Sequence, residues 1–129
     1  MAAVERFEDL IAWEKARELY AEVRRVCLMK DMQREFELKD QLLRSALSVM
    51  SNIAEGFERG GRAEFAQFLS LAKGSCAEVR SLLYAALDAT VIDQDTFAKL
   101  SRQAEEVSRI VGGLRSAVAR QRDEARKSR

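Results

Sequence analysis

Apolar residues recur at helical spacing in four long segments of the chain, which short polar connections separate. The segments span residues 9–28, 38–59, 62–89 and 94–122. In each, an apolar side chain returns every three or four positions, which places these side chains on one side of an α-helix. Gly60 is a residue type that commonly follows a helix end, and Asp93 is a good N-cap. The pattern predicts an all-α fold, an antiparallel up-down four-helix bundle that residues 1–129 form as one domain.

The second and third segments have unusually few charged residues on their polar sides. Between positions 41 and 57 only Arg44 and Glu55 are charged, and positions 65–87 hold only three charges. A helix side in contact with water normally carries many charged side chains. We therefore expect other copies of the chain to cover these two helices, in a closed homo-oligomer such as a ring or a dimer.

Seven polar residues lie on these weakly charged sides, where a buried charge needs a partner. We expect a hydrogen-bond and ion-pair network that fixes the helix register or a subunit contact, formed by Gln41, Arg44, Ser48, Asn52, Glu55, Ser75 and Glu78. The alternative is a metal-dependent nucleotide hydrolase that uses Glu55, Glu58 and Glu78. A single Glu-x-x-Glu pair is a weak signal for a magnesium site. We therefore predict a non-enzymatic protein with no catalytic residue, metal ligand or cofactor.

Several compositional features narrow the function further. The chain contains no histidine, which excludes a Ser-His-Asp or Cys-His apparatus within it and removes the usual zinc ligand. Cys27 and Cys76 fall in apolar helical rows, so we expect two buried free thiols. The N-terminal residues lack the apolar region of a secretory signal, and no apolar run approaches the roughly 20 residues that span a bilayer. These features predict a cytoplasmic protein with no membrane partner.

Basic residues collect at the C-terminal end of the chain, in an arm at residues 115–129. The arm carries a net charge of +4, whereas the rest of the chain carries −3. If the fourth helix continues, Arg115, Arg122, Arg126 and Arg129 share one side of it, and arginine is well suited to phosphate. The candidate nucleic-acid-binding residues are Arg115, Arg120, Arg122, Arg126, Lys127 and Arg129.

The chemistry of this arm predicts how it would bind. No aromatic residue follows Phe97, so base stacking by the arm is not expected. Binding to RNA or DNA would be directed to the phosphate backbone and would weaken steeply with salt. The alternative is a solvated basic tail without a ligand.

Three motifs resemble those of a known bacterial family. The motifs are Phe7-x-Asp9-Leu10-x-x-Trp13, then Gln41-Leu42-x-Arg44-x-Ala46-x-Ser48-x-x-x-Asn52-Ile53-Ala54-Glu55-Gly56, then Phe65-x-x-Phe68-Leu69-x-x-Ala72-x-Gly74-Ser75-x-x-Glu78. The family is the bacterial four helix bundle protein family, also called the rRNA intervening-sequence protein family. The chain is similar too to the accessory variability proteins of diversity-generating retroelements.

The resemblance implies a four-helix bundle that assembles as a homopentameric barrel. In the retroelement relatives the barrel binds nucleic acid and a reverse transcriptase through basic surface, and no member is known to be an enzyme. We thus expect an oligomeric interaction module with itself, RNA, DNA or a nucleic-acid enzyme as partner; a purely structural scaffold is a further alternative. The chain departs from many members at Met50, where they have proline, and near Thr90, where they have glycine. These departures leave a kink in the second helix and the tightness of the third turn open.

Overall fold

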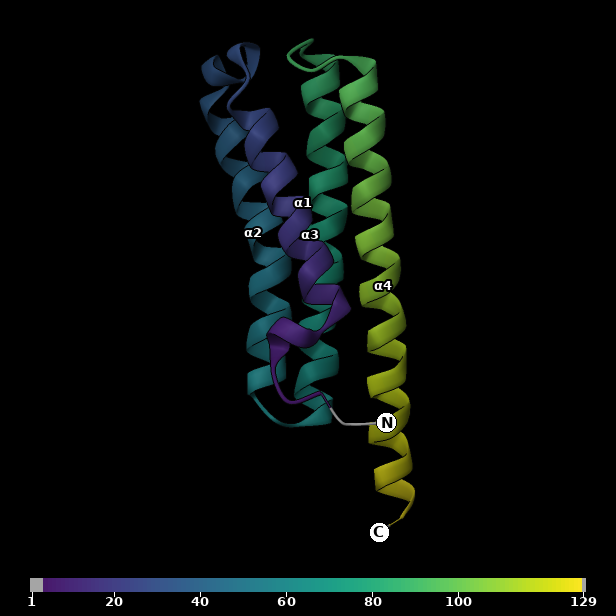
Figure 1. Ribbon diagram of the computed structural model, residues 1–129. Helices are drawn as coiled ribbons and strands as arrows, with labels where there is room; N and C mark the ends of the chain where they lie inside the picture. Colours follow the sequence, from purple (N-terminus) through teal and green to yellow (C-terminus); the bar gives the residue numbers. More distant parts are fainter. Residues whose placement is uncertain (1–3, 129) are drawn as a thin grey trace.

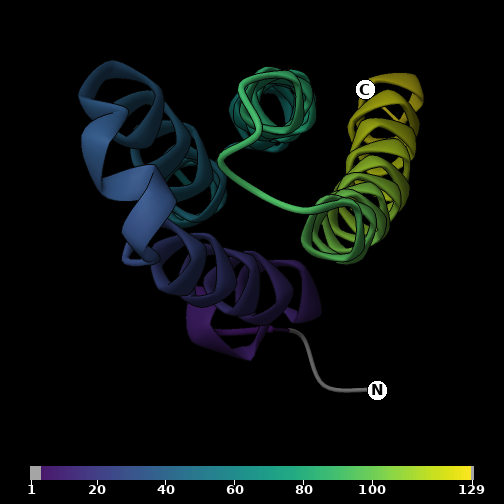
Figure 2. The ribbon, with the colours of Figure 1, turned by 90° about the horizontal axis from the view of Figure 1, so that it is seen from above.

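The computed structural model describes residues 4–128, and these form a bundle of four α-helices with two short 3-10 helices. The α-helices are α1 (Ile11–Cys27), α2 (Phe36–Glu58), α3 (Arg62–Asp88) and α4 (Gln94–Lys127), and the 3-10 helices are η1 (Phe7–Asp9) and η2 (Lys30–Arg34). Consecutive α-helices run in opposite directions and lie side by side (Figure 1), and all four surround one centre when the bundle is seen from above (Figure 2). The predicted all-α four-helix bundle is confirmed.

The apolar rows of the four helices meet in a single core. Leu19, Ile53, Leu69, Leu83 and Leu100, which come from all four helices, are each at most 1% exposed. Burial of such side chains is the main force that holds a bundle together. The apolar row predicted for the last helix lies in this core, and its members are Phe97, Leu100, Ala104, Val107, Val111 and Val118, with Leu114 half-buried beside them.

The helix ends differ from the prediction at three places. The first α-helix begins at Ile11, because η1 occupies Phe7–Asp9 and Leu10 has an extended backbone with ψ 127°. The second α-helix begins at Phe36 rather than at residue 38, and the connection before it contains η2, which contributes the fully buried Met32. The last helix runs to Lys127 rather than to residue 122, so most of the basic arm is helical.

Two of the three turns depend on a residue with a left-handed backbone. Gly60 has φ +81°, as expected for the residue that follows a helix end. Thr90 has φ +58°, a conformation that strains a β-branched residue, so the third turn closes tightly without a glycine at this position. Gly61 stands at the N-cap of α3, and Glu64 in the first turn of α3 lies 3.6 Å from Arg59.

Asp93 caps α4, as predicted, and its contribution to stability should depend on pH. Its carboxylate accepts a hydrogen bond of 2.8 Å from the Thr96 N–H, and hydrogen bonds from Thr96 lower the Asp93 pKa. A group with a lowered folded-state pKa stabilises the fold above its unfolded pKa and loses this effect as pH falls through the folded value. Asp93→Ala should therefore lower the melting temperature at neutral pH, and the difference from the natural protein should shrink in strong acid. Asp93→Asn, which keeps a capping oxygen, is the control, and equal melting temperatures of the natural protein and Asp93→Ala at neutral pH would contradict the prediction.

Two further expectations concern the cysteines and membranes. Cys27 and Cys76 are buried free thiols, and burial raises the pKa of each to about 11, so both remain protonated at neutral pH. None of the helices that the structure describes is long and apolar enough to cross a membrane.

Candidate nucleic-acid interface

Three arginines of the C-terminal arm line a groove between the end of α4 and the start of α3. Arg115 and Arg122 line a first hollow of about 360 Å³, together with Ala63, Ala66, Gln67, Ser70 and Ala119. Arg122 and Arg126 line a second hollow of about 540 Å³, together with Gly60, Gly61, Arg62, Ala63, Glu64 and Ala125. The two hollows share Arg122 and Ala63 and therefore adjoin. We call them together the arginine groove.

The sequence spacing explains why these arginines share one side of α4. Positions 115, 122 and 126 are separated by seven and four residues, which correspond to about two turns and one turn of helix. Their side therefore faces the same neighbour along about 16 Å of α4, at 1.5 Å per residue. That neighbour is the first half of α3, which offers small side chains at Ala63 and Ala66. The result is a groove whose α4 side carries the three arginines and whose α3 side has small residues between Arg62 and Ser70.

Few carboxylates compete for the arginines of the groove. Arg115 donates its Nε hydrogen bond to the Ser70 hydroxyl of α3. Arg122 donates from Nε to the Asp123 carboxylate at 3.0 Å. Within residues 4–128, no carboxylate lies within 4.0 Å of Arg115 or Arg126. Most of these guanidinium N–H groups thus remain available to an anion.

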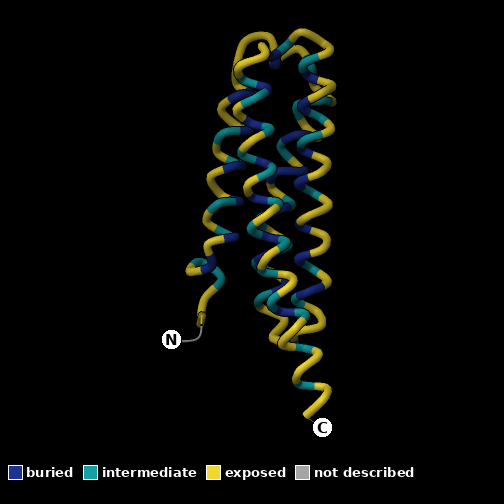
Figure 3. The backbone as a smooth tube through the Cα atoms, turned by 90° about the vertical axis from the view of Figure 1, so that its right-hand side faces the viewer, coloured by how far each residue is buried: buried dark blue, intermediate teal, exposed yellow. Residues whose placement is uncertain are grey.

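The other candidate residues of the arm are placed differently. Arg120 and Lys127 are exposed and line neither hollow, because helical periodicity turns them more than 100° away from the arginine groove. Arg129 lies outside the described residues. The C-terminal end of α4 extends beyond the turn between α2 and α3 (Figure 1) and is largely exposed (Figure 3). Arg115, Arg122 and Arg126 thus share one side of α4, as their spacing predicts. The sequence did not single out Arg62 and Ser70, which only the packing of α3 on α4 brings to them.

A second group of polar residues lies along the contact between α2 and α3. Ser75 of α3 donates to the Ser48 hydroxyl at 3.0 Å, and Asn52 donates to the same hydroxyl at 2.9 Å. Ser45, which is 3% exposed, donates to the Glu78 carboxylate. The predicted hydrogen-bond network therefore exists in part, and Ser45 is a member that the sequence did not single out.

The four outer members of this network are exposed in the single chain, and the predicted cover by other copies is not tested by it. Gln41, Arg44, Glu55 and Glu78 are all exposed. Gln41 bonds to Glu37, and Glu55 pairs with Arg59 at 3.0 Å, one helical turn away in each case. A helix side with few charges is compatible both with solvent and with a second copy. A role in a subunit contact stays a prediction.

The outer surface of α2 and α3 also presents large apolar side chains. Phe36 is 72% exposed, Leu47 45% and Leu71 53%. Leu43 and Met50 are half-buried and fall on the same side of α2 as Leu47 by helical spacing. Singly exposed apolar groups are common on monomers, so the row of Leu43, Leu47 and Met50 along one side of α2 is the feature that supports the predicted cover by another copy.

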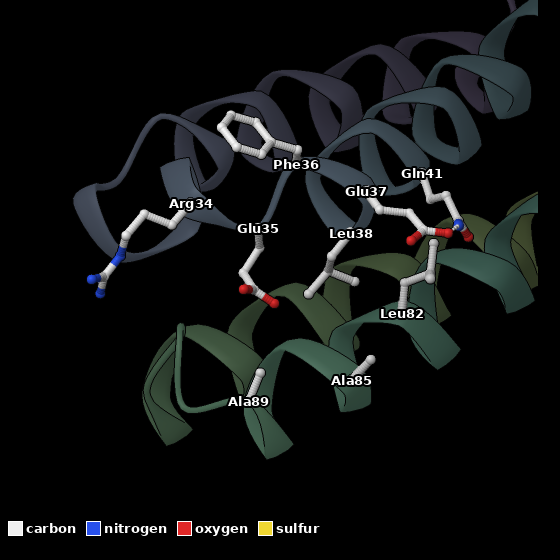
Figure 4. A pocket seen from close by; sticks show the side chains of 9 residues that line it. All are labelled: Arg34, Glu35, Phe36, Glu37, Leu38, Gln41, Leu82, Ala85 and Ala89. Carbon is white, nitrogen blue, oxygen red and sulfur yellow. Dashed lines mark hydrogen bonds between the residues drawn. The ribbon is translucent and has the colours of Figure 1, made fainter.

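A further hollow of about 560 Å³ lies where α2 begins and α3 ends. In Figure 4, Leu38 of α2 and Leu82 of α3 point toward each other across it, and Glu35 and Gln41 stand at its edge. Phe36 projects away from the space between the helices. The lining mixes one guanidinium group, that of Arg34, with carboxylate, amide and apolar groups, whereas three arginines line the second hollow of the arginine groove. No sequence signal pointed to this hollow.

The alternative of a carboxylate metal site finds no assembled ligands. Among the described residues no group of three or more histidine, cysteine, aspartate or glutamate side chains could hold a metal ion. Glu55 is paired with Arg59, and Glu78 accepts from Ser45 on the neighbouring helix. The three glutamates of the hydrolase hypothesis are therefore not gathered by the fold of a single chain.

Comparison with known proteins agrees with this architecture. Residues 8–113 match the model of the family described as 23S rRNA-intervening sequence protein. A crystal structure of a protein with unknown function from the S23 ribosomal protein family, from Bacteroides thetaiotaomicron, has a TM-score of 0.76 and 20% sequence identity. The similarity covers 82% of this chain and 96% of that one, and at this identity it shows the fold alone. No curated protein matches. Because the family match covers most of the chain, the protein belongs to the 23S rRNA-intervening sequence protein family.

Proposed function

We propose that this protein is a non-enzymatic, self-associating helical module that binds the phosphate backbone of RNA or DNA through the arginine groove. The observation that carries the proposal is the alignment of Arg115, Arg122 and Arg126 along one groove between two helices. The row is about 16 Å long, and B-DNA advances about 3.4 Å per nucleotide along each strand, so the row can face several phosphates. A nucleic-acid enzyme such as a reverse transcriptase is a further partner that the retroelement resemblance suggests.

The lining of the groove determines the kind of binding. No aromatic side chain lines either hollow in the described part of the chain, so bases have no surface on which to stack. Arginines without carboxylate partners recognise phosphate oxygens whatever the base sequence. The proposed binding is therefore weakly sequence-selective and electrostatic. In an assembly of identical copies the groove would be repeated, which would strengthen binding to a long polymer.

Removal of the three groove arginines should abolish most of this binding. We expect Arg115→Ala/Arg122→Ala/Arg126→Ala to lower the affinity for a single-stranded oligonucleotide at least tenfold at about 50 mM salt. The slope of log affinity against log salt should fall by roughly 2, at about 0.7 per lost phosphate contact. Fluorescence anisotropy over a salt series measures both quantities.

A second triple variant controls for the loss of three positive charges. Lys99→Ala/Arg102→Ala/Arg109→Ala removes the same charge from exposed positions of the same helix, outside the groove. It should retain most of the affinity and nearly the full salt slope. Equal losses in the two variants, or no binding by the natural protein at about 50 mM salt, would refute the proposed function, because phosphate contacts are strong in that range.

A further inference from the structure

We propose that Arg62 of α3 completes, with Arg122 and Arg126 of α4, a seat for one phosphate group. This inference rests on the proposed function, because the seat is the second hollow of the arginine groove. It adds a residue from outside the C-terminal arm and assigns a defined ligand position within the groove. Arg62 lies 60 residues before Arg122 in the sequence, and the packing of α3 against α4 brings both to one hollow.

The charges around this hollow favour an anion. Three guanidinium groups line it, and Glu64 is the one carboxylate among its lining residues. Glu64 lies 3.6 Å from Arg59, which does not line the hollow, so part of its charge is already compensated. Among residues 4–128, no carboxylate lies within 4.0 Å of Arg62 or Arg126. Like charges that converge in this way repel one another, and a bound anion relieves the repulsion.

The hydrogen-bonding groups of the three arginines are largely unused. Arg122 donates its Nε hydrogen bond to Asp123, and both of its terminal nitrogens remain free to donate to a ligand. No side-chain hydrogen bond involves Arg62 or Arg126 within the described chain. A guanidinium group donates two parallel hydrogen bonds to a phosphate, and three such groups match the three or more oxygens that a phosphate presents.

The shape of the hollow admits a phosphate with its attached sugar. Its volume is about 540 Å³, whereas one water in the liquid occupies about 30 Å³. Apart from Glu64 and the arginines, its walls are Gly60, Gly61, Ala63 and Ala125, whose side chains are too short to fill it. The Glu64 carboxylate lies at the edge of this space, 3.5 Å from the position that a Cβ at Gly61 would take, and Arg59 compensates part of its charge.

Two sources could supply the phosphate, and both offer phosphate oxygens that accept hydrogen bonds from arginine. One is an internal phosphodiester of a nucleic-acid strand, with one negative charge. The other is a terminal phosphate monoester, which carries about 1.5 to 2 negative charges at neutral pH. A seat with three arginines would gain more from the monoester.

The test compares Arg62→Ala with Arg109→Ala, which removes the same charge from an exposed position outside the groove. The probe is a labelled single-stranded oligonucleotide of 12 nucleotides, synthesised once with a 5′-phosphate and once with a 5′-hydroxyl. We expect Arg62→Ala to weaken binding of at least one probe about three- to tenfold and to lower the salt slope by about 0.7, the value for one phosphate contact. Arg62→Lys should recover part of the loss, and Arg109→Ala should bind within twofold of the natural protein.

The outcomes separate the two sources and the two proposals. An equal loss for both probes indicates an internal phosphodiester, and a loss confined to the 5′-phosphate probe indicates a terminal monoester. Identical affinities of Arg62→Ala and Arg109→Ala for both probes would overturn the seat while leaving the proposed function intact.

If the natural protein binds neither probe, the proposed function fails, and the seat is then tested with inorganic phosphate. Phosphate should shift the amide NMR signals of Gly60, Gly61 and Arg62, and unshifted signals would overturn the seat as well.

Discussion

Leu47→Glu is expected to reduce the mass of the protein in solution to that of a single chain. Leu47 is 45% exposed on the outer side of α2, and Phe36 and Leu71 are exposed on the same pair of helices. If another copy covers this surface, the substitution places an unpaired carboxylate in an apolar contact, which costs several kcal/mol. Light scattering at micromolar concentration, before and after the substitution, measures the effect.

Ile11→Glu is the matched control for this experiment. Ile11 is an aliphatic residue with 65% exposure, but it lies on α1, whose polar side is strongly charged. We expect Ile11→Glu to leave the assembly mass unchanged. A natural protein that is already a folded single chain at micromolar concentration would rule out self-association through α2 and α3. Five copies, as the family resemblance implies, would be read directly from the mass.

Gly56→Ala should destabilise the bundle by about 1–2 kcal/mol, although alanine is the better helix former by about 1 kcal/mol. Gly56 is buried where α2 contacts α3, and a Cβ there would lie 2.5 Å from the Phe68 Cβ and 3.2 Å from a ring carbon of Phe65. The Phe68 Cβ is fixed to the α3 backbone, so the two helices must move apart to admit the methyl group. Urea denaturation followed by circular dichroism gives the change in the free energy of unfolding.

A second glycine gives the opposite expectation and isolates the steric effect. Gly113 lies inside α4, and a Cβ at this position meets no atom within 4 Å. Gly113→Ala should therefore stabilise the protein by about 0.5–1 kcal/mol through helix propensity alone. If Gly56→Ala were as stabilising as Gly113→Ala, the close approach of α2 to α3 at Gly56 would be disproved.

The helices were predictable because their apolar residues repeat with the helical period, and this repeat does not depend on tertiary context. Helix ends were less predictable, since they depend on local backbone choices. One example is η1, which ends at Asp9 and delays the start of α1 to Ile11. Thr90 is a second example, because its φ of +58° is imposed by the turn and contradicts the usual preference of a β-branched residue.

The candidate site was predictable only where it lies on one helix. The side shared by Arg115, Arg122 and Arg126 follows from their spacing alone. The contributions of Arg62 and Ser70 do not, because they depend on how α3 packs against α4. The predicted cover of Glu55 and Glu78, which are exposed in the single chain, does not follow from one sequence alone, because a neutral helix side is compatible both with solvent and with a second copy.

The position of Val118 has a practical consequence for the basic arm. Val118 is the last buried residue of α4, and every described side chain after it is exposed or half-buried. A chain shortened to end at Ala119 would therefore lose about two helical turns but no core side chain. Changes in the length or charge of this projecting segment should therefore cost little folding free energy.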